Sequence, residues 1–189
     1  MDFVGIEKLS FVDWEDKIVC TLFMQGCNFR CPFCHNENLV LNINKKIKGI
    51  PFDSILDFLK LRKGKLEGVV ITGGEPTLMP DLVDKIRKIK SLGYPIKLDT
   101  NGSNPQILKF LVENHLIDYV AMDIKNSIKK YPETIGLKKF NFENTRESIS
   151  YLLSNAIPYE FRTTLVSEFH DEESIDEMGQ LIKGAKKIY

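Results

Sequence analysis

Residues 18–35 read IVCTLFMQGCNFRCPFCH, and this stretch is the most informative in the chain. Its first part, 18–24, is an apolar run of the length of a buried strand. The run leads directly into a loop with Cys27, Cys31 and Cys34, and the only other cysteine is Cys20 inside the run. The sequence therefore offers three thiolates from one short loop and no fourth cysteine to complete a set.

Three thiolates from one loop favour an iron–sulfur cluster with one open iron. Cubane clusters usually take four protein thiolates, one for each iron. An open coordination position is typical of a metal that binds a substrate or cofactor. The CxxxCxxC spacing therefore points to a catalyst rather than to an electron carrier.

Other uses of these cysteines stay open at this point. His35 could complete a Cys3His zinc set, although it directly follows the last cysteine and is poorly placed to close a tetrahedron. Cys31 and Cys34 alone have the spacing of a redox dithiol, which would leave Cys27 unused. A disulfide framework fits four cysteines in an intracellular chain least well. We rank the cluster first, zinc second and the dithiol third.

Composition excludes several classes of protein. The chain has 189 residues, of which 43% are hydrophobic and 28% charged, as expected for one globular domain. Lys plus Arg equal Asp plus Glu, at 26 each, so we expect no nucleic-acid partner. An apolar stretch of transmembrane length and a signal peptide are both absent, so we expect no membrane partner and a cytoplasmic, reducing location.

Strand and helix patterns alternate along the chain. Strands are expected at 18–24, 66–72, 96–100, 118–124 and 159–166, with a further strand starting at 185–189. Helices are expected at 52–61, 81–92, 105–114, 143–155 and 172–183. This alternation predicts an α/β fold built from βα units around a parallel sheet.

Four unusual segments follow the predicted strands. They are the cysteine loop, GGEP at 73–76, TNG at 100–102 and MDIK at 122–125. In parallel α/β folds, functional residues gather at the carboxyl ends of the strands. We therefore expect all four segments at one site. Glycines there allow a close backbone approach, and Lys125 and Arg162 suit a carboxylate ligand.

The cysteine loop with aromatic Phe33, followed by GGEP, resembles the radical S-adenosylmethionine (SAM) enzymes. The longer segment SFVDWEDKIVCTLFMQGCNFRCPFCHN, at 10–36, is similar to the opening of glycyl-radical-enzyme activases, especially those of anaerobic ribonucleotide reductase. The resemblance implies a partial (β/α)6 barrel whose last unit is incomplete, and a chain that is naturally short or truncated. It also implies one radical SAM domain over 1–189, with an N-terminal extension or hairpin at 1–17 and the partial barrel at 18–189.

The resemblance implies specific roles for individual residues. Cys27, Cys31 and Cys34 would be catalytic and bind a [4Fe–4S] cluster, whose open iron would bind SAM. The remaining residues implied to bind SAM are Phe33, His35, Gly73, Gly74, Glu75, Asp99, Thr100, Asn101, Asp123, Lys125 and Arg162. Glu75, with the two glycines before it, would receive the methionine amino group, and Arg162 its carboxylate. The pair Asp99 and Asp123 would also help to hold a monovalent cation.

The function implied is an oxidoreductase that cleaves SAM reductively to a 5′-deoxyadenosyl radical. That radical would generate a glycyl radical on anaerobic ribonucleoside-triphosphate reductase, with a flavodoxin or ferredoxin-type electron donor. Two alternatives remain. One is a radical SAM enzyme acting on a small molecule, similar to 7-carboxy-7-deazaguanine synthase. The other is a zinc-stabilised binding module.

Overall fold

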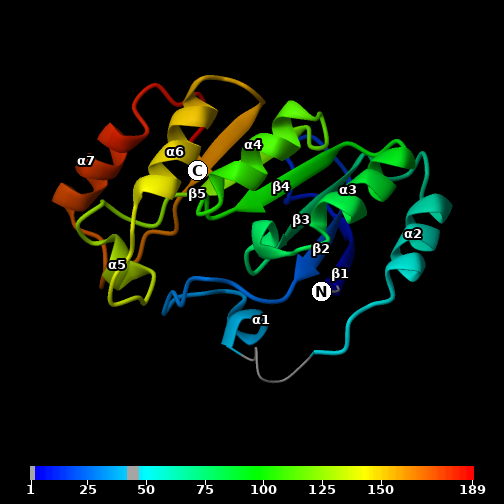
Figure 1. Ribbon diagram of the computed structural model, residues 1–189, viewed down its shortest axis with the longest axis horizontal. Coiled ribbons are helices and arrows are strands. Elements are labelled where there is room, and N and C mark those ends of the chain that lie inside the picture. Colours follow the sequence, from blue (N-terminus) through cyan, green and yellow to red (C-terminus); the bar gives the residue numbers. More distant parts are fainter. Residues whose placement is uncertain (1–2, 42–46) are drawn as a thin grey trace.

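A computed structural model describes residues 3–41 and 47–189. Its sheet has six strands in chain order, of which β2 to β6 are parallel and β1 is antiparallel to β2 (Figure 1). They are β1 (Phe3–Ser10), β2 (Val19–Met24), β3 (Gly68–Gly73), β4 (Ile96–Thr100), β5 (Tyr119–Asp123) and β6 (Tyr159–Arg162). The sheet is open, which confirms the expected α/β partial barrel.

The helices largely follow the expected pattern, with ends shifted by a residue or two. They are α1 (Glu37–Leu41), α2 (Phe52–Leu61), α3 (Leu82–Ser91), α4 (Pro105–Glu113), α5 (Tyr131–Thr134), α6 (Glu143–Leu153) and α7 (Glu172–Leu181), with a 3-10 turn η2 (Pro76–Leu78). The short helices α1 and α5 have no counterpart in the sequence prediction. Figure 1 shows α1 beside the loop that follows β2. In the described part of the chain no helix is both long and apolar enough to cross a membrane.

Two predicted strands are shorter in the structure. The strand expected at 159–166 ends at Arg162, because β5 offers no backbone partner beyond Ile124, whose N–H donates to the Arg162 carbonyl at 2.9 Å. The strand expected at 185–189 is reduced to one parallel bridge between Phe161 and Ile188. Because the strands stop early, the residues after Asp123 and Arg162 form loops, and Thr163 and Thr164 line the cavity described below.

Side chains alternate between the two faces of the sheet. On β4, Ile96 and Leu98 join the main hydrophobic core, which also contains apolar residues of α2, α3, α4 and α6. Cys20 is part of this core, as its position within a strand predicts. The opposite face is here called the inner face; it carries Val19, Val70, Lys97, Asp99, Tyr119, Ala121, Asp123, Glu160 and Arg162. The inner face is therefore largely polar.

The N-terminal segment covers one end of the inner face. Strand β1 pairs with β2, and Trp14 in the connection packs against Val19, Val70 and Tyr119. A Cβ on Gly68 would lie 2.9 Å from the Trp14 ring, so the indole lies directly against the sheet. Trp14 thus closes the end of the inner face away from the carboxyl ends of the strands.

Candidate active site

A cavity of about 450 Å³ lies at the carboxyl ends of the parallel strands. This volume is within the usual range for a small-molecule site. Every site residue expected from the sequence lines it except Glu75: Cys27, Cys31, Phe33, Cys34, His35, Gly73, Gly74, Asp99, Thr100, Asn101, Asp123, Lys125 and Arg162. The fold therefore brings together residues as far apart in the sequence as Cys27 and Tyr189.

The three loop cysteines are free and partly buried. The backbone N–H of Phe29 donates to Cys27 Sγ at 3.3 Å, and the Asn101 side-chain amide lies 3.8 Å from the same sulfur. Burial raises the pKa of Cys27 to about 11 and the pKa of Cys31 above its ordinary value. Thiolates at these positions therefore need a positive charge nearby, which a bound metal supplies.

The cysteine loop and the GGEP loop are in backbone contact. The Gly74 N–H donates to the Met24 carbonyl at 2.9 Å, and the Glu75 N–H donates to the Gly26 carbonyl at 2.8 Å. A Cβ on Gly74 would overlap the Gly26 carbonyl oxygen, and Gly73 has a φ of +115°, which disfavours other residues. These glycines are therefore needed to pack the two loops together, besides any approach to a ligand.

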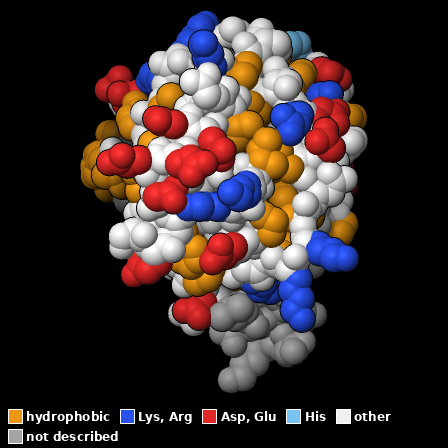
Figure 2. Space-filling model, turned by 90° about the vertical axis from the view of Figure 1, so that its left-hand side faces the viewer, with side chains coloured by type: hydrophobic (Ala, Val, Ile, Leu, Met, Phe, Trp, Pro, Cys, Tyr) orange, Lys and Arg blue, Asp and Glu red, His pale blue; other side chains and the backbone are white. Residues whose placement is uncertain are grey.

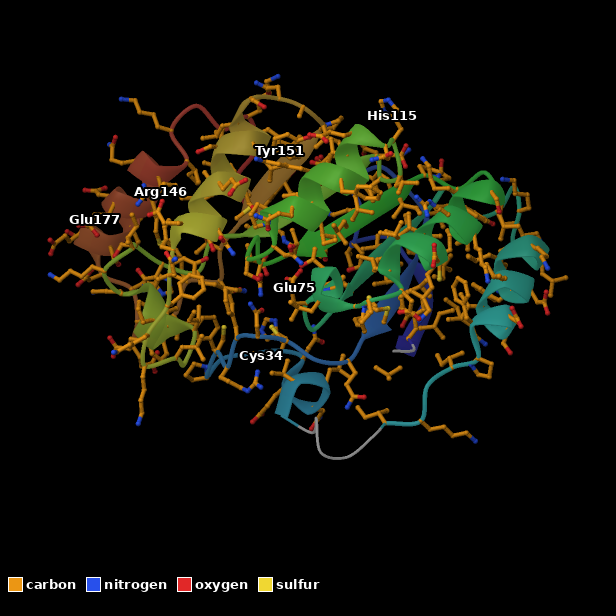
Figure 3. The ribbon with its side chains drawn as sticks, viewed as in Figure 1. Cys34, Glu75, His115, Arg146, Tyr151 and Glu177 are labelled. Atoms are coloured by element: carbon orange, nitrogen blue, oxygen red, sulfur yellow. The ribbon has the colours of Figure 1, made fainter. Side chains whose placement is uncertain are left out.

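Glu75 is located behind the cavity lining, with only 2% of its surface exposed. Its Oε1 accepts from the Thr77 N–H at 3.1 Å, the Thr77 hydroxyl at 2.6 Å and the Thr100 hydroxyl at 2.8 Å. Its Oε2 accepts from the Asn101 N–H at 2.6 Å. The carboxylate therefore joins the GGEP and TNG loops, a setting different from the one expected of a ligand for an ammonium group. Figure 3 shows Cys34 below Glu75 near the middle of the view and His115 at the upper edge.

Four charged side chains form a network at the cavity wall. Arg162 donates through Nε to Asp123 at 3.1 Å and through Nη1 to Asp99 at 3.1 Å. Lys125 Nζ donates to the other oxygen of Asp123 at 3.0 Å. Two acids and two bases give this network no net charge. The remaining donors of Lys125 and Arg162 leave capacity for an anionic ligand.

The two aspartates of this network differ in environment. Burial raises the pKa of Asp99, and the nearby Arg162 only partly offsets that effect. For Asp123 burial also favours the neutral acid, but Lys125 and Arg162 together lower its pKa below the ordinary value. Asp99 Oδ1 is buried and has no hydrogen-bond partner among the described residues. Asp99 thus accepts fewer hydrogen bonds than Asp123.

An aromatic pair stands at another side of the cavity. The ring centroids of Phe33 and Phe169 are 5.6 Å apart, so the loop after β6 contacts the cysteine loop. His170, next to Phe169, does not line the cavity; its Nε2 lies 2.9 Å from the Lys125 carbonyl oxygen. His170 therefore contacts the backbone of the MDIK segment and does not face the cavity.

Sequence reasoning missed several residues of the site. Asn36 donates to the Gly73 carbonyl at 3.0 Å and lines the cavity. Other lining residues not anticipated are Phe29, Val40, Thr72, Thr163, Thr164 and Tyr189. Thr163 and Thr164 directly follow Arg162 in the FRTT segment, so their position after a strand was the available signal. Phe29 and Asn36 lie within the segment 10–36 and Thr72 directly precedes GGEP, so their positions carried a similar signal, whereas Val40 and Tyr189 carried none.

The sequence pattern of the Radical SAM superfamily matches residues 21–183 of this chain. The chain belongs to the radical SAM superfamily. This membership overturns the alternative of a zinc-stabilised binding module. It also accounts for the placement of the cysteine loop at the carboxyl ends of the strands.

Two relatives show which members of the radical SAM superfamily this chain is similar to. A protein of Methanocaldococcus jannaschii named as a glycyl-radical enzyme activating enzyme is 36% identical over 184 residues, covering 95% of this chain and 74% of the relative. The 7-carboxy-7-deazaguanine synthase of Aquifex aeolicus is 34% identical over 138 residues, covering 64% of this chain and 60% of the relative. The chain is thus similar to both kinds of protein.

Among solved structures, SuiB of Streptococcus suis has a similar fold, with a TM-score of 0.64 and 17% sequence identity. The match covers 86% of this chain but only 36% of SuiB, so the chain spans about a third of that protein. At this identity the likeness shows a shared fold alone.

The residues of this radical SAM chain fit the cofactors that the superfamily implies, a [4Fe–4S] cluster and SAM. Three soft thiolates from one loop line the cavity, and soft donors suit iron–sulfur clusters. Among the described residues, no three His, Cys, Asp or Glu side chains converge on a single ion. A cubane does not need such convergence, because each thiolate binds a different iron. The open cationic donors of Lys125 and Arg162 fit a ligand with a carboxylate.

Proposed function

We propose that this radical SAM enzyme is an activase that installs a glycyl radical on a partner enzyme. The observation that carries the proposal is one cavity lined both by the three loop cysteines and by Lys125 and Arg162. A single ligand there can reach a cluster with one end and a cationic wall with the other. The similarity over 95% of the chain to a protein named as a glycyl-radical enzyme activating enzyme supports the activase class.

In this proposal Cys27, Cys31 and Cys34 hold the [4Fe–4S] cluster. When bound, the cluster would supply the electron for cleavage of SAM to methionine and a 5′-deoxyadenosyl radical, and that radical would take a hydrogen atom from a glycine Cα. The chain itself orients SAM and excludes water from the site. Preorganised groups at the cavity wall serve this purpose because they need no rearrangement when the ligand binds.

The SAM contacts divide among the loops. Phe33 and His35 line the cavity and would contact the adenosine portion, and Phe169 packs against the Phe33 ring. Gly73 and Gly74 present backbone atoms to the methionine amino group. Thr100 and Asn101 line the ribose side, and Lys125 with Arg162 binds the carboxylate. Glu75 contributes through its backbone and through the hold that its side chain has on Thr100 and Asn101.

A monovalent cation is part of the proposal. Asp99 and Asp123 lie on the inner face close to the carboxylate-binding side chains, and Asp99 Oδ1 lacks a partner among the described residues. A hard cation favours carboxylate oxygen ligands. To test this point, the affinity for SAM is measured in potassium chloride, in sodium chloride and in choline chloride at equal ionic strength. Equal affinity in all three salts would rule the cation out.

We propose anaerobic ribonucleoside-triphosphate reductase as the partner, with a flavodoxin or ferredoxin-type protein as electron donor. This assignment rests on the similarity of residues 10–36 to the opening of the activases of that reductase. The proposal also includes a cytoplasmic location and excludes a nucleic-acid or membrane partner. Figure 2 shows acidic and basic side chains intermixed on the face of the molecule that it displays, in keeping with the neutral composition.

A second candidate keeps the same site and changes the substrate. The similarity to the 7-carboxy-7-deazaguanine synthase of Aquifex aeolicus favours a radical SAM enzyme that acts on a small heterocycle. That match covers 64% of the chain, against 95% for the activase relative, so the activase is the preferred candidate.

The deciding experiment is anaerobic cluster reconstitution followed by reduction with dithionite in the presence of SAM. We expect a brown protein that forms 5′-deoxyadenosine, and a Cys31→Ala variant that does not. Cys20→Ala is the matched control, because Cys20 lies in the core away from the cavity and should keep the cluster. A reconstituted protein that leaves SAM intact would refute the proposed chemistry.

The partner is tested in the same reaction. Purified anaerobic ribonucleoside-triphosphate reductase is added, and its glycyl radical is detected by electron paramagnetic resonance. We expect the doublet of a glycyl radical with the native chain and no signal with Cys31→Ala. Formation of 5′-deoxyadenosine without the doublet, together with formation of 7-carboxy-7-deazaguanine from a small heterocyclic substrate, would favour the small-molecule candidate instead.

A further inference from the structure

Two ion pairs cross the inner face, one behind the other. Lys97 Nζ lies 2.8 Å from Glu160 Oε1, and Arg162 Nη1 lies 3.1 Å from Asp99 Oδ2. The pairs join the same two strands, since Lys97 precedes Asp99 by two residues on β4 and Glu160 precedes Arg162 by two on β6. Along β4 a positive charge is followed by a negative one, and along β6 a negative charge is followed by a positive one.

A small residue makes this arrangement possible. Strand β5 separates β4 from β6, so the partners are two strand spacings apart, about 10 Å. Ala121 on β5 is in register with Asp99 on one side and with Glu160 on the other. Its side chain is fully buried and extends only one carbon from the sheet. Long side chains can therefore meet across β5 at this point.

The pair deeper in the fold is far more buried than the pair at the cavity. Only 4% of the Lys97 side chain and 7% of the Glu160 side chain are exposed. The Tyr119 hydroxyl donates to Glu160 Oε2 at 3.0 Å, and Lys97 Nζ lies 5.4 Å from the centre of the Tyr119 ring. Neither residue lines the cavity. A buried ion pair contributes little net stability compared with apolar side chains of the same size, so its presence calls for another role.

We propose that Lys97 and Glu160 are positioning residues for the carboxylate end of the ligand. This inference rests on the proposed function, in which Arg162 binds the SAM carboxylate. Glu160 lies two residues before Arg162 on the inner face of β6, and Lys97 lies two residues before Asp99 on the inner face of β4, so each puts a fixed charge of opposite sign behind its neighbour. In an interior of low dielectric, this field holds Arg162 and Asp99 charged and oriented, so that the remaining guanidinium donors of Arg162 face the ligand without rearrangement.

Reversal of the buried pair separates this role from simple packing. The double variant Lys97→Glu/Glu160→Lys keeps the ion pair and the net charge but places like charges next to Asp99 and Arg162. We expect its affinity for SAM to fall by about tenfold or more, because one such repulsion in the interior exceeds the free energy of a tenfold change. The same reversal at the surface pair Lys109→Glu/Glu147→Lys, which is 34% and 43% exposed, should leave the affinity unchanged.

The ligand provides a second control. Decarboxylated SAM keeps the amino group and the adenosine but lacks the carboxylate that Arg162 binds. Isothermal titration should show that the buried reversal weakens SAM binding and barely changes binding of the decarboxylated form. A merely structural defect would weaken both ligands alike, so equal losses would overturn the inference.

Further outcomes also decide the matter. If the buried reversal does not fold, the neutral variant Lys97→Met/Glu160→Leu replaces it, and an affinity for SAM equal to that of the native chain would overturn the inference. A native chain that binds no SAM would refute the proposed function and this inference together. Native binding with an unaffected reversal would refute the positioning role alone.

Discussion

The backbone N–H of Asn101 donates a hydrogen bond of 2.6 Å to the Oε2 atom of Glu75. This bond connects the loop after β4 to the loop after β3, and it is completely buried. Asn101 also donates from its side chain to Asn28 Oδ1 at 2.9 Å, in the cysteine loop. Glu75 is thus the centre of a bridge that fixes three loops of the radical SAM site relative to one another.

Replacement of Glu75 tests this bridge. In Glu75→Gln one oxygen acceptor becomes an amide donor that faces other donors, so the variant should lose about 2–3 kcal/mol of folding free energy. Chemical denaturation of the protein without cluster or SAM measures the loss. The exposed Glu113→Gln is the control and should change stability by less than about 0.5 kcal/mol. Equal stability of the two variants would show that the bridge contributes nothing.

A methyl group at Gly74 tests the backbone contact between loops. Because its Cβ would overlap the Gly26 carbonyl oxygen, Gly74→Ala should lose about 1–3 kcal/mol and bind the cluster poorly. Gly179→Ala is the matched control: it lies in α7 with no atom within 4 Å of the added Cβ, and should gain about 0.5–1 kcal/mol. Thermal melting compares them, and a stable Gly74→Ala chain would contradict the close contact.

The aromatic pair gives a prediction on ligand binding. Phe169→Leu removes the ring next to Phe33, and such a pair contributes about 0.5–1.5 kcal/mol beyond area burial. We therefore expect SAM to bind about 2- to 10-fold more weakly, measured by titration calorimetry. Phe110→Leu, on α4 and partly exposed, is the control and should bind SAM as the native chain does. Identical affinities would show that Phe169 does not support the adenosine side.

The N-cap of α7 predicts a dependence of stability on pH. A hydrogen bond from Lys130, together with bonds from Ser174, lowers the pKa of Asp171 below its ordinary value of 3.8. A carboxylate with a lowered folded-state pKa stabilises above its unfolded pKa and loses that contribution as the pH falls. Asp171→Ala should therefore be less stable than the native chain at pH 7.

The difference between these two chains should stay constant down to about pH 5 and shrink as the pH falls below 3.8. Denaturant titrations at pH 7, 5 and 3 measure it. Because Asp171 directly follows Phe169 and His170, amide exchange in 163–170 should also rise in the variant at neutral pH. A stability difference that grows on acidification would contradict the sign of this pKa shift.

The elements of the fold were accessible from local sequence patterns. The apolar runs and helical spacings predict most strands and helices to within a few residues, because these depend on neighbours close in sequence. The strand expected at 159–166 is too long by four residues (166 minus 162), since its end depends on where β5 stops offering backbone partners. The bridge between Phe161 and Ile188 likewise depends on a contact with β6, which is distant in the sequence from residues 185–189.

The sequence by itself determined the parallel α/β order, the three-cysteine loop and the end of the sheet at which the unusual segments gather. Only the tertiary structure decided where their side chains point. Glu75 turns away from the cavity to Asn101, and Lys97 meets Glu160 across Ala121. The physical reason is that such contacts depend on the packing of loops and on the stagger between non-adjacent strands, which no local spacing encodes.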